Sequence, residues 1–286
     1  MSIRPRRSAL YLPASNLKAI AKARTLPCDV VILDLEDAVA PDAKAVAREN
    51  AIAAVRDGGF GSRELIVRVN GLDSEWGEAD CAALAAVTPD AILVPKVSTA
   101  ADIAAYARHF DGTLTPLWAM VETALSLLRL DEIASAGRND HGRLAGLVMG
   151  TNDLAKEMGA QLDLSREPFI GALGFAVAAA RAYGLVILDG VFNDIDDESG
   201  FVSQARQAVK FGFDGKTLIH PRLVEPCNTA FTPDAAAIDW AHRVLGAFDE
   251  PANADRGAIR LDGKMVERLH LHQARRTLAA AGLEPV

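Results

Sequence analysis

The sequence predicts a closed (β/α)8 TIM barrel followed by a C-terminal helical extension. Eight short apolar runs alternate with Ala-rich, helix-like stretches along the 286-residue chain. The runs are apolar on both faces, as buried parallel strands are, and each ends in a polar residue or a turn pair. Strict alternation of this kind predicts parallel strands joined by right-handed helical crossovers. Eight repeats favour a barrel, which takes about 250 residues, over a doubly wound open sheet.

The predicted elements follow one another at regular spacing. The strand runs are SALYLP, DVVILDLED, ELIVRVN, AILVPKV, PLWAMVET, LAGLVMGTND, LVILDGV and GKTLIHP. Helices are expected over 15–24, 43–56, 75–86, 99–108, 125–136, 165–183 and 197–211. The candidate N-caps are Asp42, Ser74, Ser98 and Ser165, and Gly58-Gly59 is expected to end the second helix.

Two domains are expected. Residues 1–230 would form the barrel and residues 231–286 an extension that packs on a neighbouring subunit. In the extension we expect a helix over 233–249, a linker-like PANADRG stretch, a short strand-like GAIRLDGKMV segment and a helix over 267–281.

Composition excludes several classes of protein. Half of the residues are hydrophobic, which predicts a sizeable core, and the net charge of −8 argues against a general nucleic-acid or membrane-surface binder. The N-terminal apolar stretch is too short for a signal peptide, and no run of about 18 apolar residues predicts a membrane span. Three widely spaced cysteines, Cys28, Cys81 and Cys227, indicate reduced thiols that pack as small apolar groups. A cytoplasmic location is therefore expected.

Polar side chains gather at the carboxyl ends of the predicted strands. In a (β/α)8 barrel these ends all lie on one face, which holds the active site. The row consists of Asp34, Glu36, Asp37, Arg68, Asn70, Lys96, Glu122, Asn152, Asp153, Asp189 and His220.

Glu122 and Asp153 end neighbouring strands, the fifth and the sixth. Two carboxylates suit Mg²⁺, which takes its other ligands from water and substrate oxygens. No His/Cys cluster has the spacing of a zinc site. The alternative is that each residue caps the helix that follows it, but their place on adjacent strands favours the metal.

Arg68 could hold a substrate carboxylate through its planar fork. The alternative is a structural ion pair with Glu36 or Asp37, and both roles can hold together. Strand alternation predicts Asp34 and Glu36 on one face and Asp37 on the other, with Arg68 and Lys96 as partners of the barrel-facing acids. A Schiff-base role for Lys96 is disfavoured, because neighbouring acids would keep the amine charged.

Two further features lie near the last strands. His220 could be a base or a hydrogen-bond donor, or it could be held structurally at the barrel edge. In GTND at 150–153, backbone N–H groups at a helix start could receive a ligand carboxylate. The sequence contains no Walker loop, GxGxxG or GxSxG motif.

Together the motifs DLEDAV, VETA, GTNDLA and GFDGKTLIHP, with RVNGLD, VPKV and the tail LDGKMV, resemble a known family over essentially the whole chain. They are similar to the citrate lyase β-subunit-like (CitE-like) proteins of the HpcH/HpaI aldolase superfamily. The resemblance implies a homotrimeric or hexameric barrel that uses Mg²⁺ as a carbon–carbon lyase. A 3-hydroxyacyl-CoA thioester, such as citramalyl-CoA, malyl-CoA or citryl-CoA, would be split to a 2-oxo acid and an acyl-CoA.

The resemblance leaves two other activities open. One is hydrolysis of a malyl-CoA-like thioester at the same site. The other is service as the β subunit of a citrate lyase complex, acting on a thioester bound to an acyl carrier protein.

The resemblance also implies roles for single residues. Glu122 and Asp153 would bind the metal, Arg68 would bind the substrate carboxylate, and the backbone at His220 would lie near the acyl end. Arg7 is a looser candidate for contact with the CoA portion, as is Lys18.

The tail departs from the family pattern. Lyases of this family often carry GxMID or GxMVD, with an aspartate that acts as acid/base in a neighbouring subunit's site. Here Glu267 stands at that place, in GKMVERLH. A glutamate has the same carboxyl chemistry with a longer reach, so Glu267 is the candidate catalytic acid/base.

Overall fold

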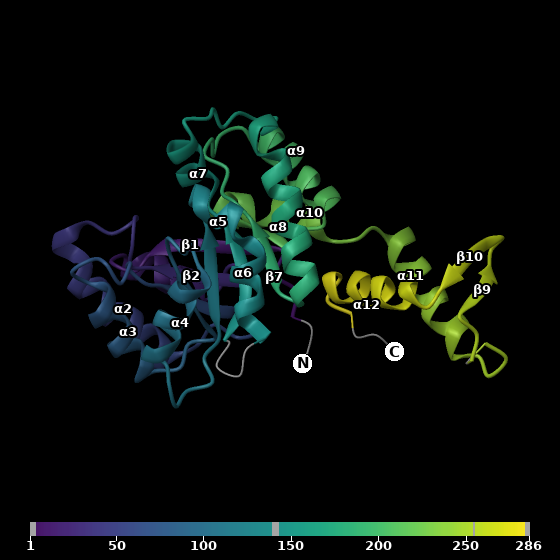
Figure 1. Cartoon of the computed structure of the whole chain (residues 1–286), viewed down its shortest axis with the longest axis horizontal. Coiled ribbons are helices and arrows are strands. Elements are labelled where there is room, and N and C mark those ends of the chain that lie inside the picture. The colour runs from purple at the N-terminus through teal and green to yellow at the C-terminus, as the bar shows by residue number, and fades with distance from the viewer. Residues whose placement is uncertain (1–3, 139–142, 254, 284–286) are drawn as a thin grey trace.

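The computed structural model describes residues 4–138, 143–253 and 255–283, and at its centre eight parallel strands close into a barrel (Figure 1). The strands are β1 Ser8–Pro13, β2 Val30–Asp34, β3 Glu64–Arg68, β4 Ala91–Val94, β5 Leu117–Val121, β6 Leu144–Met149, β7 Val186–Asp189 and β8 Gly215–Leu218. They pair in chain order, and β1 also pairs with β8. The barrel prediction is confirmed, and each predicted run contains one strand.

Helices surround the barrel. They are α1 Leu17–Ala23, α2 Lys44–Asp57, α3 Gly77–Ala85, α4 Ala100–His109, α5 Ala124–Leu128, α6 Leu130–Ser135, α7 Thr151–Met158, α8 Ile170–Tyr183, α9 Glu198–Phe211 and α10 Val224–Phe231. Short 3-10 turns lie at Pro41–Ala43, Ala136–Arg138, Glu167–Phe169 and Pro221–Leu223. The expected helix over 125–136 is divided, because Arg129 leaves helical geometry with φ −121° and ψ 22°. The helix start expected within GTND is confirmed by α7, although no range was predicted for that helix, and α10 was not predicted.

None of the four predicted N-caps stands at the cap position itself, although Ser74 Oγ accepts from the backbone N–H of Gly77, the first residue of α3, at 3.2 Å. The cap positions of α2, α3, α4 and α8 are Ala43, Trp76, Thr99 and Phe169. A 3-10 turn precedes α2 and α8 and moves the helix start past the predicted cap. At α4, Thr99 forms a reciprocal capping box with Asp102. The predicted end of α2 is confirmed, since Gly58 closes it with φ 61°.

The strands separate two apolar layers. Val30 and Ile32 belong to a cluster inside the barrel, whereas Val31 and Leu33 belong to the larger cluster under the helices. Trp118 fills the interior, and Gly146 on the next strand makes room for it, because a Cβ there would lie 2.7 Å from the indole ring. Inward and outward residues thus alternate along each strand, as the doubly apolar runs indicated.

The three cysteines are buried and free. Burial raises the pKa of Cys81 and Cys227 to about 12. Both thiols therefore stay protonated and unreactive, and the prediction that cysteines serve as packing residues is confirmed.

The C-terminal extension consists of α11 Ala235–Asp249, the antiparallel hairpin β9 Ala258–Leu261 and β10 Lys264–Glu267, and α12 Leu269–Ala280. It has its own small apolar core and projects from one side of the barrel, with β9 and β10 at the far end (Figure 1). Arg276 of α12 contacts Asp214, which directly precedes β8, at 3.4 Å. The extension therefore meets the amino ends of the strands. In the described part of the chain, no helix combines the length and the apolarity that crossing a membrane requires.

Candidate active site

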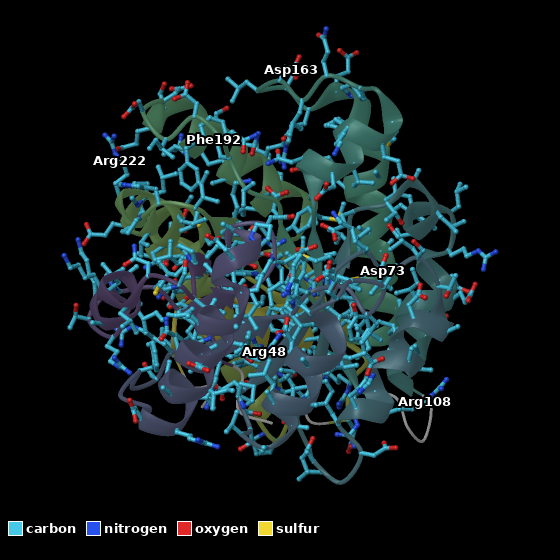
Figure 2. The ribbon with its side chains drawn as sticks, turned by 90° about the vertical axis from the view of Figure 1, so that its left-hand side faces the viewer. Arg48, Asp73, Arg108, Asp163, Phe192 and Arg222 are labelled. Atoms are coloured by element: carbon cyan, nitrogen blue, oxygen red, sulfur yellow. The ribbon has the colours of Figure 1, made fainter. Side chains whose placement is uncertain are left out.

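A cavity of about 410 Å³ opens at the carboxyl ends of the strands. Its lining includes Tyr11, Arg68, Met120, Glu122, Asp153 and Thr217. Figure 2 views the molecule from the left-hand side of Figure 1, with Asp73 from the loop after β3 on one side and Phe192 and Arg222 from the loops after β7 and β8 on the other. The row of strand-end residues predicted from the sequence converges on this cavity only in part.

Glu122 directly follows β5 and is 1% exposed. Its Oε1 accepts a hydrogen bond of 2.7 Å from the backbone N–H of Lys96. Its Oε2 is buried and has no hydrogen-bond partner among the described residues. Burial raises the pKa of Glu122, while Lys96 and Arg68 lower it, and the net shift is upward. A buried carboxylate oxygen without a partner is costly unless a ligand completes it.

Gly150 of the GTND motif makes this arrangement possible. A Cβ at Gly150 would lie 2.4 Å from Glu122 Cβ and 2.7 Å from Glu122 Oε2. Any other residue would push the carboxylate out of place, so the glycine serves close approach here and not a turn.

Asp153 lies in the first turn of α7, where its Oδ2 is 2.8 Å from Lys96 Nζ. The same ammonium lies 3.5 Å from Glu122 Oε1. The two predicted metal ligands are thus brought together around one cation. The N-cap alternative is wrong for both, because Thr123 caps α5 and the cap position of α7 is Gly150.

Lys96 pairs with different acids from those predicted. The sequence pointed to the DLED acids, but the ion pairs of its Nζ are with Glu122 and Asp153. Burial lowers the pKa of Lys96, but the hydrogen bond with Asp153 and the charge of Glu122 raise it by more, so its pKa lies above the ordinary value. A permanently charged amine is no Schiff-base nucleophile.

Arg68 is held by three acids. Its Nε and Nη2 donate to the two oxygens of Asp34, each at 2.7 Å, and its Nη1 lies 2.7 Å from Glu36 and 3.4 Å from Asp37. The predicted ion pair is confirmed. The prediction that Asp37 points to the opposite face was wrong, because β2 ends at Asp34 and strand alternation ends with it. The Tyr11 ring covers the guanidinium at 5.0 Å.

A buried network fixes the turn that holds these acids. Lys44 Nζ donates to the backbone oxygen of Glu36 and to Asn70 Oδ1, both at 2.7 Å. The Asn70 side-chain amide donates to Asp80 at 2.6 Å. Asn70, a member of the strand-end row, therefore positions the turn rather than facing the cavity.

Charge at the cavity is unbalanced. The two cations Arg68 and Lys96 face five carboxyl groups, so acids outnumber cations. Burial raises the pKa of Glu36 to about 8 in spite of Arg68, whose charge is already shared with Asp34. No group of three or more His, Cys, Asp or Glu side chains forms a metal cluster in the described residues. A site with two carboxylates, more acids than cations and a buried oxygen without a hydrogen-bond partner among the described residues fits a hard divalent cation such as Mg²⁺.

Asp189 belongs to a different cluster, outside the barrel wall. Its carboxylate accepts from Arg166 Nη1 at 2.6 Å and Lys216 Nζ at 2.8 Å, and Lys216 also donates to Gln204 on α9. All three charged side chains are at most 1% exposed. The sequence analysis missed Arg166 and Lys216, because nothing local indicates that a loop arginine and a strand lysine share one carboxylate.

His220 caps the 3-10 turn Pro221–Leu223, where its Nδ1 accepts from the backbone of Arg222 at 3.2 Å. Its neighbour Ile219 lines the cavity. This is the structural role that the sequence left open, and contact of the segment with an acyl group remains a prediction.

The structure corrects the predicted role of Arg7 in binding the substrate. It precedes β1, at the amino ends of the strands, and its guanidinium binds Asp29 at 2.8 and 2.9 Å and Thr232 at 2.9 Å. A strand of six residues, about 20 Å long, separates it from the cavity. Arg7 therefore cannot contact a substrate in the cavity of its own chain.

Glu267 lies at the end of β10, where its backbone N–H donates to His270 Nδ1 at 2.9 Å. Since the extension meets the amino ends of the barrel, Glu267 is remote from the cavity of its own chain (Figure 1). An acid/base role for Glu267 requires a second subunit.

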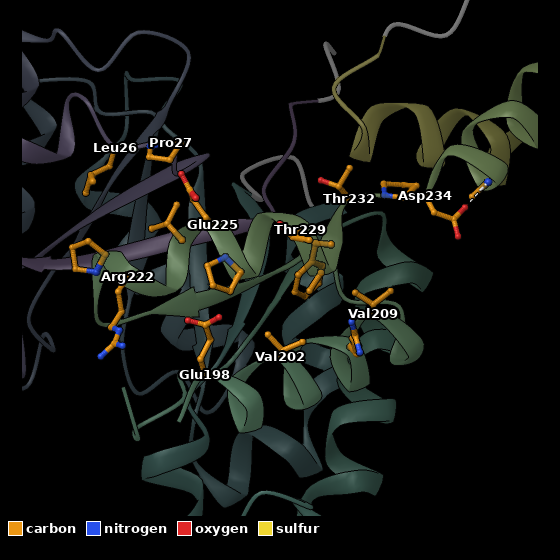
Figure 3. Close-up of a pocket in the computed structure, with 18 of the residues that line it drawn as sticks. Leu26, Pro27, Glu198, Val202, Val209, Arg222, Glu225, Thr229, Thr232 and Asp234 are labelled. Atoms are coloured by element: carbon orange, nitrogen blue, oxygen red, sulfur yellow. Dashed lines mark hydrogen bonds between the residues drawn. The ribbon is translucent and has the colours of Figure 1, made fainter. Parts of the chain in front are cut away.

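A larger groove, of about 1260 Å³, runs between α9, α10 and the loop at Leu26 and Pro27 (Figure 3). Its charged residues are rim groups, such as Arg222, which is paired with Asp196 at 2.7 Å. Among the described residues, Glu122 Oε2 is a buried carboxylate oxygen without a hydrogen-bond partner, and Glu122 lines the smaller cavity. The groove is larger, but the smaller cavity contains the side chains suited to binding a metal. We therefore take the smaller cavity as the candidate active site.

Known proteins are similar to this chain in sequence and in fold. A family model for HpcH/HpaI aldolase/citrate lyase matches residues 7–221. A (3S)-malyl-CoA thioesterase of Cereibacter sphaeroides is 48% identical over 97% of this chain and 95% of its own length. An L-malyl-CoA/beta-methylmalyl-CoA lyase of the same species is 34% identical over 95% of this chain and 93% of its own.

Solved structures of the same family have the same fold. The CitE protein of Mycobacterium tuberculosis, in complex with magnesium, acetoacetate and coenzyme A, superposes with a TM-score of 0.74 at 29% identity, over 98% of each chain. The matched strands carry the cavity described above. On the family match and the identity to these relatives, the chain belongs to the HpcH/HpaI aldolase/citrate lyase family, as a CitE-like member.

Proposed function

We propose that this protein is a Mg²⁺-dependent lyase. It would break a carbon–carbon bond in the CoA thioester of a 3-hydroxy dicarboxylic acid, such as malyl-CoA, and release a 2-oxo acid and an acyl-CoA. The observation that carries the proposal is the buried Oε2 of Glu122, which has no hydrogen-bond partner among the described residues and belongs, with Asp153, to a cluster in which acids outnumber cations. The relatives named for malyl-CoA and the magnesium complex of the CitE protein support it.

Glu122 and Asp153 would hold the metal through their carboxylates. When bound, Mg²⁺ would supply Lewis-acid stabilisation of the negative charge that develops on substrate oxygens. Gly150 keeps the Glu122 carboxylate close to the barrel wall, and the backbone N–H of Lys96 fixes its orientation. The Glu122 carboxylate, which would bind the metal, is thus oriented before any ligand arrives.

Arg68 would hold the substrate carboxylate. Its guanidinium is oriented by Asp34, Glu36 and Asp37 and lines the cavity. A fixed charged donor of this kind positions a carboxylate at low entropic cost. In the reaction, a base takes the hydroxyl proton, the bond between the hydroxyl carbon and the α-carbon of the thioester breaks, and its electron pair forms a thioester enolate. Protonation of that enolate completes the acyl-CoA, so atoms and charge balance.

The base would be Glu267 of a neighbouring subunit. Within one chain, the extension contacts the amino end of β8 through Arg276 and Asp214, whereas the cavity is lined by residues at the carboxyl ends of the strands. We therefore propose a homotrimer or hexamer in which the extension packs on a neighbour.

Hydrolysis of the same thioester is the second candidate reaction. The 48% identity to a (3S)-malyl-CoA thioesterase favours it specifically. The same carboxylates, metal and Arg68 would bind the substrate, but water would attack the thioester carbonyl and release CoA and the free hydroxy acid.

Product analysis tests both reactions. Malyl-CoA, citramalyl-CoA and citryl-CoA are incubated with the enzyme and Mg²⁺, and oxo acid and free CoA thiol are measured separately. Oxo-acid release without free thiol indicates the lyase, and free thiol without oxo acid indicates the thioesterase. Full activity in EDTA would contradict the metal role. Asp153→Asn is expected to abolish turnover, with Glu157→Gln, an exposed acid on the same helix, as the matched control.

A further inference from the structure

Lys96 combines an unusual backbone conformation with a partly exposed side chain. Its φ of 52° lies in the left-handed region, which is costly for a residue with a Cβ. That conformation aims its N–H at Glu122 Oε1. Buried Pro95 and Val97 flank it and hold the backbone. The side chain, in contrast, is 42% exposed.

The ammonium of Lys96 lies between the two carboxylates that would hold a divalent cation. It is 2.8 Å from Asp153 Oδ2 and 3.5 Å from Glu122 Oε1, the same two carboxylates that suit the metal. A divalent cation bound to these two carboxylates would lie close to the ammonium, and two positive charges so near each other repel strongly in a partly buried site. The backbone contact with Glu122 does not depend on where the side chain lies, so the ammonium can leave without releasing the carboxylate.

We propose that Lys96 is the resident counter-ion of the metal site: its ammonium neutralises Glu122 and Asp153 when no divalent cation is bound, and it withdraws to solvent when one binds. The inference rests on the metal site of the proposed function. It adds that the affinity for metal is set by competition with a side chain of the same protein. Lys96 is thereby a positioning residue through its backbone and a competitor through its side chain.

The test measures metal binding and not turnover. Protein stripped with EDTA is titrated with MgCl₂ by calorimetry at pH 8, as wild type and as Lys96→Met, which keeps the stem and removes the charge. The variant is expected to bind Mg²⁺ about tenfold more tightly or better, because the competing charge is gone. Lys156→Met, which removes an exposed lysine from the same helix as Asp153, should stay within about twofold of wild type.

Thermal unfolding gives a second measurement. In EDTA, Lys96→Met should melt below wild type because the two carboxylates have lost their counter-ion, and Mg²⁺ should raise its Tm by more than that of wild type. If the methionine variant does not fold, Lys96→Gln replaces it. Equal or weaker Mg²⁺ binding by the variant would overturn the proposal, as would binding that survives Glu122→Gln. Since no substrate is involved, failure to turn over malyl-CoA would count against the proposed function alone.

Discussion

Two ionic clusters of this barrel differ in how completely they are paired. Outside the wall, Asp189 is shared by Arg166 and Lys216, and glutamine side chains and a backbone carbonyl take up the remaining donors. At the mouth, two cations face five carboxyl groups, and Glu122 keeps a buried oxygen without a hydrogen-bond partner in the described residues. The first cluster is complete and stabilises the fold. The second is incomplete and is suited to a ligand.

The largest expected effect is on function, at the incomplete cluster. Glu122→Gln should lower Mg²⁺ affinity and turnover by at least about 100-fold, since even outer-shell changes at metal sites cost about 10–100-fold. Its stability in EDTA should not fall, because the substitution removes a buried charge that burial already disfavours. Calorimetry, product assay and urea unfolding check these points. A large loss of stability with unchanged metal affinity would show that Glu122 is structural.

The complete cluster should respond in the opposite way. Asp189→Asn leaves the charges of Arg166 and Lys216 buried without a carboxylate, and we expect a loss of about 3–5 kcal/mol in the free energy of unfolding. Urea denaturation measures it, with Asp194→Asn on the exposed loop after β7 as control. If Asp189→Asn unfolded like wild type, the contrast between the clusters would be wrong.

Gly150→Ala tests whether packing sets the position of Glu122. The new methyl group would overlap the Glu122 side chain and must displace it. We expect a destabilisation of about 1–3 kcal/mol together with weaker Mg²⁺ binding. Gly171→Ala is the control, because a Cβ at Gly171 meets no atom within 4 Å.

The last expected effect is a pH dependence from Glu36, and it concerns stability alone. Its pKa is about 8 in the fold against an ordinary 4.5, so between these values the folded chain holds a proton that the unfolded chain has lost. Stability from this group is therefore lost as the pH rises from about 5 to 8. Glu36→Gln should remove that part of the slope and be the more stable protein at pH 8 by about 1–3 kcal/mol. The free energy of unfolding is measured by urea denaturation at several pH values. If it changed equally with pH in wild type and Glu36→Gln, the prediction would be wrong.

The strand ends were predictable because they depend on local pattern. Strand order alone predicts that Glu122 and Asp153 are neighbours. The same argument predicts that Arg68 pairs with the acids that follow the second strand. The pairing of Lys96 was not predictable, because a left-handed backbone at residue 96 turns it towards Asp153 and away from the DLED acids. The place of Asp189 outside the barrel wall was not predictable either, since the last residue of a strand can face the cavity or the helices.

By itself the sequence determined the eight-stranded barrel, the face that holds the chemistry and the residues able to bind a metal and a carboxylate. These follow from hydrophobic period and from chain order, which are local properties. Only the tertiary structure decided which strand-end residues share a cavity and that Arg7 and Glu267 lie away from the cavity of their own chain. It also decided that Glu122 keeps an oxygen without a hydrogen-bond partner among the described residues. The physical reason is that burial and ion pairing depend on what the rest of the chain places around a side chain.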